Sequence, residues 1–139
     1  MDSERYRRGW DLLQQIDPQQ ANGLLAELGE IAPDFAKYIV EFPFGDIYSR
    51  PGLDLQKREL VAVAALTALG NALTQLKVHI RYALKVGCAR EEILEVIMQT
   101  AVYAGFPAAL NGLFAAREVF RQNGAEAGPG VQDKPRTNL

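Results

Sequence analysis

Hydrophobic side chains recur every three or four positions along most of residues 1–123, and no stretch alternates apolar and polar residues as a strand would. This spacing predicts helices over residues 4–16, 19–31, 55–69, 74–86, 89–103 and 107–122, with a further helix beginning at Pro33. The sequence therefore predicts an all-α fold, a single-domain bundle of about six to seven helices over residues 1–123. Residues 124–139 have no apolar pattern, and we expect a disordered C-terminal tail there.

The middle of the chain is its most apolar part. The segment Leu60–Leu69 contains one polar residue, so we expect the helix over residues 55–69 to be buried on most sides. Pro43 interrupts the helical pattern before it. Residues 44–55, which include a Pro51-Gly52 turn signal, are predicted to form a structured loop.

Composition and charge narrow the class of protein. A formal net charge of −2 gives no basic surface for nucleic acid or anionic membranes, so neither partner is expected. No apolar run approaches the roughly 18 residues of a membrane span, and the charged N-terminus has no signal-peptide core. One cysteine, Cys88, excludes an intrachain disulfide, and one histidine without calcium-loop or zinc spacing predicts no metal site. We expect a soluble, cytoplasmic domain.

Glu59 and His79 are the strongest candidates for catalysis. His79 is the only histidine, and Glu59 lies on the preceding helix, so an antiparallel pairing of these helices would place both near the same end. A carboxylate that accepts from one imidazole nitrogen fixes the tautomer and leaves the other nitrogen to transfer protons near neutral pH. The alternative is a solvent-paired Glu59 beside a structural histidine, because structural ion pairs show the same pattern.

Arginines are candidates for binding an anionic substrate, because a guanidinium matches a carboxylate with two parallel hydrogen bonds. Arg50 stands in a loop and Arg58 lies near the start of the central helix, and both are predicted as substrate-binding residues. Arg81 lies two positions from His79 and off its helical face, which favours an ordinary surface arginine.

Further side chains are candidates for lining a pocket around His79. Gln75 and Tyr82 share its helical face at i−4 and i+3, and with Tyr48 they are predicted as substrate-binding residues. Asn111 stands among alanines and leucines, which indicates a buried hydrogen bond or a contact with a partner chain. Three aromatic residues are pocket candidates with an ordinary core position as the alternative: Trp10, Tyr103 and Phe106.

Several segments between residues 40 and 121 carry a recognisable pattern: Phe44-Gly-Asp-Ile-Tyr-Ser-Arg-Pro-Gly-Leu53, Arg58-Glu-Leu-Val61, Gln75-Leu-Lys-Val-His-Ile80, Gly87-Cys-Ala-Arg-Glu-Glu-Ile93 and Tyr103-Ala-Gly-Phe-Pro-Ala-Ala-Leu-Asn111. Through them the chain resembles the carboxymuconolactone decarboxylase family. The resemblance implies the all-helical fold of alkyl hydroperoxide reductase D-type proteins. It also implies a ring-like homo-oligomer, commonly a hexamer, with a trimer as the alternative.

The resemblance also implies a chemistry. One branch of the family has a glutamate followed by Cys-x-x-Cys-x-x-x-His. Glu59 and His79 match its glutamate and histidine, but Ala72 and Gln75 occupy its cysteine positions, which excludes dithiol peroxidase chemistry. The decarboxylase branch releases CO₂ from γ-carboxymuconolactone in aromatic catabolism, without metal or organic cofactor. Its dedicated decarboxylases more often have serine in place of Glu59, which leaves the substrate open.

The leading hypothesis is therefore a cofactor-free decarboxylase of a small carboxylated lactone, in which Glu59 orients His79 and Arg50 or Arg58 binds a carboxylate. One alternative is a non-catalytic, oligomeric, small-molecule-binding member of the family. Another is a weak thiol-dependent antioxidant relative, which Cys88 disfavours because it lies outside the family's cysteine positions. Helices this rich in alanine and leucine also predict a homo-oligomer.

Overall fold

The computed structural model describes residues 1–126, and within them the chain forms helices and no strand. The prediction of an all-α fold is confirmed. The elements are α1 (Glu4–Ile16), α2 (Pro18–Ile31), α3 (Pro33–Ile39), the π-helix η1 (Val40–Tyr48), α4 (Leu55–Leu69), α5 (Leu73–Lys85), α6 (Arg90–Ala104) and α7 (Phe106–Glu126). The last helix continues past its predicted end at residue 122. The remainder of the predicted tail, 127–139, lies outside the described residues.

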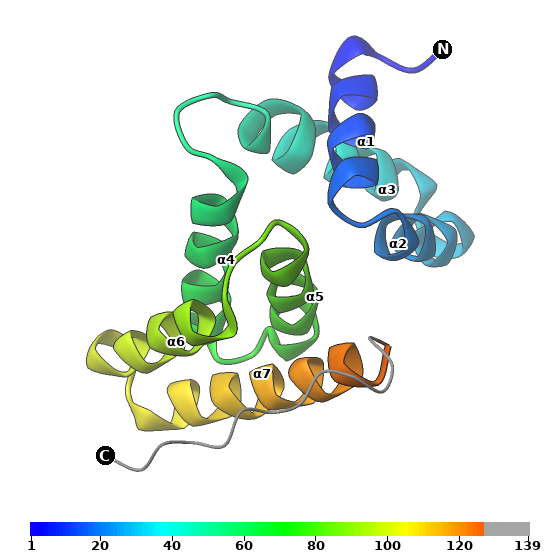
Figure 1. Cartoon of the computed structure of the whole chain (residues 1–139). Coiled ribbons are helices and arrows are strands. Elements are labelled where there is room, and N and C mark those ends of the chain that lie inside the picture. Colours follow the sequence, from blue (N-terminus) through cyan, green and yellow to red (C-terminus); the bar gives the residue numbers. More distant parts are fainter. Residues whose placement is uncertain (127–139) are drawn as a thin grey trace.

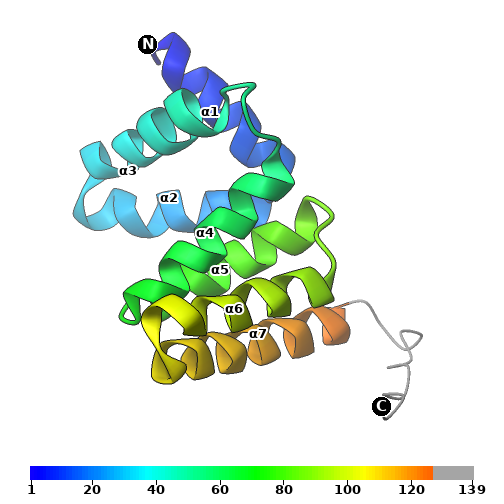
Figure 2. The same ribbon diagram turned by 90° about the vertical axis from the view of Figure 1, so that its left-hand side faces the viewer.

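The helices form two groups, α1 to η1 and α4 to α7, as Figures 1 and 2 show from two directions. The second group has an aliphatic core that includes Val63, Ile97 and Val119. α5 belongs to both groups, because Ile80 lies in this core while Tyr82 is buried in the core of the N-terminal helices. α5 therefore contributes buried side chains to the cores of both groups.

α1 and η1 touch at a pair of glycines. A Cβ added to Gly9 would clash with the carbonyl oxygen of Val40, and one added to Gly45 would clash with that of Arg5. Arg8 Nε also donates to the Gly45 carbonyl oxygen at 2.7 Å. The two backbones can approach this closely only because both positions lack a side chain, and this contact fixes η1 against α1.

Residues 44–48 are helical, so the predicted loop over 44–55 was wrong for its first part. α3 passes without a break into η1, whose interior contains Pro43. A proline has no N–H to donate and its ring crowds the carbonyl one turn earlier, and the wider π-helical turn accommodates both. The Ser49 hydroxyl donates to the Phe44 carbonyl oxygen at 2.6 Å and closes the end of η1.

α4 is less buried than its composition suggested. Its buried residues form one stripe, Glu59, Val63 and Thr67, while Val61 and Leu69 are 61% and 65% exposed. The prediction of burial on most sides is therefore wrong for the isolated chain. Large apolar side chains are also exposed on α6 and α7: Met98, Val102, Tyr103, Phe106, Leu110 and Phe114.

No helix among residues 1–126 is long and apolar enough to cross a membrane.

Candidate functional site

The structure brings Glu59 of α4 and His79 of α5 into direct contact. Oε2 of Glu59 lies 2.8 Å from Nδ1 of His79, and the Glu59 side chain is fully buried, whereas that of His79 is one-fifth exposed. An ionised carboxylate only accepts hydrogen bonds, so Nδ1 carries the proton and donates it to Oε2. This arrangement leaves Nε2 as the imidazole nitrogen that is available for proton transfer.

The second carboxylate oxygen of Glu59 adds to the free-energy cost of burying this side chain. Oε1 is buried and has no hydrogen-bond partner among the described residues. A buried charge is costly unless an opposite charge or hydrogen bonds compensate for it. Among the described side chains, His79 is the hydrogen-bond partner of this carboxylate, and the two residues form one electrostatic unit.

His79 opens onto a cavity of about 790 Å³ between α2 and α5, here called the α2–α5 cavity. Aromatic rings frame the histidine on this side. The Tyr82 ring meets the His79 ring edge to face at 5.3 Å, and Phe44 contacts both Tyr82 and Tyr48 in the same way. Such contacts fix the orientation of the imidazole, because edge-to-face pairs have preferred geometries.

Tyr48 and Tyr82 both line this cavity, Tyr48 half-buried and Tyr82 buried. Burial is the main cause that raises the pKa of Tyr48, and the nearby Glu59 carboxylate adds to it. Burial likewise raises the pKa of Tyr82, with Asp17 and Glu59 as further causes. Both phenols therefore stay protonated at neutral pH.

Gln75, Tyr48 and Tyr82, which the sequence predicts as substrate-binding residues, all line the α2–α5 cavity. Arg50 and Arg58 are not among its described lining residues. Arg58 instead donates to two backbone carbonyl oxygens, from Nε to Leu53 at 3.2 Å and from Nη2 to Arg50 at 2.8 Å. In this structure its guanidinium holds the loop between η1 and α4 in place.

Arg81 lines the cavity, although the sequence favoured an ordinary surface position for it. Its side chain is partly buried, and Nη2 donates to Oε1 of Gln20 on α2 at 3.4 Å. The helical face of His79 predicted too narrow a wall, because Val78, Arg81 and Lys85 form a neighbouring stripe of α5 that also lines the cavity. The position of α2 across the cavity from α5 is a tertiary feature for which the sequence gives no local signal.

Three other predicted residues lie elsewhere. Tyr103 and Phe106 are 82% and 77% exposed at the junction of α6 and α7, so neither lies in the core or walls the cavity. Asn111 is exposed, which excludes the buried hydrogen bond and leaves the contact with a partner chain as its remaining prediction. Trp10 packs against the N-terminal core.

Cys88 is buried and is not among the described residues of the cavity. Burial raises the pKa of its thiol, and Glu92 and Glu59 add to this. A thiol reacts as its thiolate, so the raised pKa weakens Cys88 as a nucleophile. Within residues 1–126, no three His, Cys, Asp or Glu side chains form a group that could hold a metal ion.

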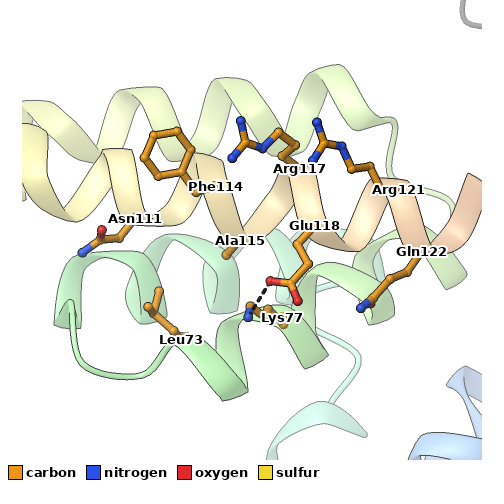
Figure 3. Close-up of a pocket in the computed structure, with 9 residues that line it drawn as sticks. All are labelled: Leu73, Lys77, Asn111, Phe114, Ala115, Arg117, Glu118, Arg121 and Gln122. Carbon is orange, nitrogen blue, oxygen red and sulfur yellow. Dashed lines mark ion pairs between the residues drawn. The ribbon is translucent and has the colours of Figure 1, made fainter.

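A second hollow, here called the α5–α7 groove, has a volume of about 460 Å³ and is shown in Figure 3. Glu118 reaches across it to Lys77, with 2.6 Å between Oε2 and Nζ. Arg117 and Arg121 point away from this ion pair in the figure. The Arg117 guanidinium lies over the Phe114 ring, 5.0 Å from its centroid. The charged groups here are paired or open to solvent.

The family model and a named relative that match this chain point to the same protein family. A model of the carboxymuconolactone decarboxylase family matches residues 33–118. A 4-carboxymuconolactone decarboxylase of Acinetobacter baylyi is 34% identical over 124 residues, 88% of this chain and 92% of the relative. A 15.0 kDa uncharacterized protein of Paracoccus denitrificans is 29% identical over 85% of this chain and 89% of its own. A nitrosuccinic acid decarboxylase of Metarhizium robertsii is 30% identical over 58% of this chain and 55% of its own.

Proposed function

This chain belongs to the carboxymuconolactone decarboxylase family, and we propose that it is a cofactor-free carboxy-lyase acting on a small carboxylated lactone such as 4-carboxymuconolactone. The observation that carries the proposal is the contact between Glu59 and His79, a wholly buried carboxylate against an imidazole that opens onto a cavity. This arrangement supports a role in proton transfer, because the contact with Glu59 engages Nδ1 and His79 lines the cavity in which a substrate would bind.

The proposed reaction begins with cleavage of the bond between the substrate carbon and its carboxylate. CO₂ leaves, and the electron pair of that bond passes into the unsaturated lactone to form an enolate. Protonated His79 then delivers the proton on Nε2 to a carbon of this enolate, which gives the enol-lactone. The imidazole keeps its Nδ1–H bond to Glu59 throughout and regains the Nε2 proton from solvent.

The carboxylate of Glu59 supports this step electrostatically. It stabilises the imidazolium before proton transfer and holds the ring in the orientation that the transfer requires. Tyr48 and Tyr82, neutral because their pKa values are raised, are the proposed hydrogen-bond donors to the developing enolate oxygen. Gln75 lines the same cavity and is a further proposed substrate contact.

The named substrates of two relatives share a feature that bears on this chain. Carboxymuconolactone and nitrosuccinic acid are both dicarboxylic acids, and each loses one carboxyl group as CO₂ and keeps the other. We expect the substrate of this chain to have the same two parts, a carboxylate that departs and a carboxylate that stays.

We also propose that the protein works as a cytoplasmic homo-oligomer, a hexamer or a trimer. The exposed apolar side chains of α4, α6 and α7 support this, because a contiguous apolar surface on a monomer is a common mark of an interface. Phe106 and Leu110, 77% and 46% exposed, would be covered by a second copy. Light scattering gives the mass in solution, and a monomer at micromolar concentration would contradict the proposal.

The test is a decarboxylation assay with freshly generated 4-carboxymuconolactone, followed by CO₂ release, with nitrosuccinic acid as a second substrate. We expect turnover by the wild type and a loss of about a thousandfold in kcat for His79→Ala, since general acid catalysis contributes about 10²–10⁴. Undiminished turnover by His79→Ala would remove His79 from the mechanism. No turnover of either substrate by the folded wild type would favour the non-catalytic binding protein.

A further inference from the structure

We propose that Arg81, aligned by Gln20 of α2, binds the carboxylate that the substrate keeps. The inference rests on the decarboxylase function proposed above and assigns its substrate-binding cation to a residue for which the sequence favoured an ordinary surface position.

His79 and Arg81 lie at opposite margins of the same cavity wall. On α5, residues 75, 79 and 82 form one stripe and residues 74, 78, 81 and 85 form the next, and all of them line the cavity. Val78 and Tyr82 therefore lie between the imidazole and the guanidinium along the wall. A small substrate that lies across these two side chains would have its reacting carbon at His79 and its far end at Arg81.

The guanidinium of Arg81 is able to bind an anion. Its one side-chain hydrogen bond within the described residues is the contact from Nη2 to Oε1 of Gln20, at 3.4 Å, which is long for such a bond. A guanidinium has five N–H donors, so the edge needed for a carboxylate is not used up by this contact. Gln20 is itself fixed at the start of α2, where its backbone N–H donates to Oδ1 of Asp17 at 3.2 Å.

The other charged groups of the cavity make Arg81 the distinctive cation. Asp17 and Glu27 line it with negative charge, which repels a dianionic substrate unless a cation compensates. Lys85 is the second cation among the described lining residues, and it is exposed, so solvent weakens its attraction. Arg81 is less exposed and offers the planar fork that matches a carboxylate.

The chemistry decides which carboxylate a cation should hold. The departing carboxylate loses its negative charge as CO₂ forms, so a strong ion pair to it would stabilise the substrate more than the transition state. The retained carboxylate keeps its charge throughout, and a cation on it binds and orients the substrate without opposing the reaction. Arg81, at the margin of the cavity wall away from His79, is in the place where the retained carboxylate would lie.

The test uses muconolactone, which keeps this carboxylate and lacks the one that departs, together with its uncharged methyl ester. Ligand-observed NMR titration measures the affinity of each for the wild type, Arg81→Gln and Arg81→Lys. We expect Arg81→Gln to weaken muconolactone binding about tenfold or more and to leave the ester unchanged. Arg81→Lys should recover part of the affinity, because it restores the charge without the fork.

Three further variants complete the design. Arg50→Gln removes the arginine that the sequence predicted for this role, and Arg117→Gln removes an arginine of the α5–α7 groove as a matched control. Gln20→Leu should weaken muconolactone binding a few-fold in the wild type and have no further effect in Arg81→Gln, since it acts through Arg81. In the turnover assay Arg81→Gln should raise KM for 4-carboxymuconolactone more than it lowers kcat.

The outcomes separate this inference from the proposed function. Equal losses for acid and ester, or a charge-selective loss in Arg50→Gln and none in Arg81→Gln, would overturn the role of Arg81 while decarboxylation stands. Failure of the wild type to bind muconolactone would also overturn it. Charge-selective binding that depends on Arg81, in a protein that turns over neither substrate, would support the anion site and reject the decarboxylase.

Discussion

The two hollows beside α5 contain similar residue types in different settings. His79 lines the α2–α5 cavity with its imidazole one-fifth exposed, and the Glu59 carboxylate that it contacts is fully buried. In the α5–α7 groove, Glu118 and Lys77 form a similarly short contact, 2.6 Å against 2.8 Å, but their side chains are 52% and 32% exposed. The same kind of charge pair is thus present on two sides of one helix, once away from water and once within reach of it.

The difference in exposure decides what each pair can do. Charges in a water-poor interior interact strongly and lose much if one partner is removed, whereas exposed pairs are screened and contribute little. A histidine whose tautomer is fixed and whose proton transfer is controlled requires the buried, water-poor environment. Charged side chains line both hollows, but only the buried pair of Glu59 and His79 has a chemistry that the protein environment can control.

The largest expected effect is on stability. His79→Leu leaves the buried Glu59 carboxylate without its partner, and breaking a buried pair in this way costs about 3–5 kcal/mol. Urea unfolding should show a loss of this order. The double variant Glu59→Leu/His79→Leu, which removes both charges, should regain most of it. A double variant as unstable as the single one would mean that packing, and not the unpaired charge, holds this site.

A second prediction concerns turnover. Glu59→Gln keeps the size of the side chain and an oxygen that can accept from Nδ1, but it removes the negative charge that stabilises the imidazolium. We expect kcat for 4-carboxymuconolactone to fall about 10- to 100-fold with little change in KM, since supporting partners of a functional histidine have effects of this size.

The matched change in the groove is Glu118→Gln, and its kcat should stay within about twofold of the wild type. An equal loss in both variants would mean that the two pairs do not differ as their exposure indicates. A fall in KM without a fall in kcat for Glu59→Gln would place Glu59 in substrate binding instead.

The helices were predicted well because local sequence signals mark most of their ends. Asp54 caps α4 with its carboxylate on the Lys57 N–H at 2.9 Å, and Gly70, at a φ of 75°, ends the same helix. The contact of Glu59 with His79 follows from two helices joined by a short turn. The sequence did not predict η1, because a proline usually ends a helix. Nothing in the local sequence shows that a wider π-helical turn accommodates Pro43.

What depends on distant partners could not be predicted. The exposed position of Val61 shows that an apolar run does not tell which of its sides another element covers. The sequence favours a surface position for Arg81 because its own helix turns it away from His79, and it lines a cavity only because α2 lies on the other side of that cavity from α5. In both cases the deciding contact comes from a part of the chain many residues away.

The smallest expected effect is that of Lys77→Met in the α5–α7 groove. It breaks the ion pair with Glu118 but leaves both positions open to solvent, and exposed pairs contribute about 0–1 kcal/mol. Urea unfolding should therefore shift by less than about 1 kcal/mol, and the shift should shrink further at high salt, because salt screens the pair. A loss comparable to that of His79→Leu would break the comparison, since it would show that the pair between α5 and α7 is as essential to the fold as the buried one.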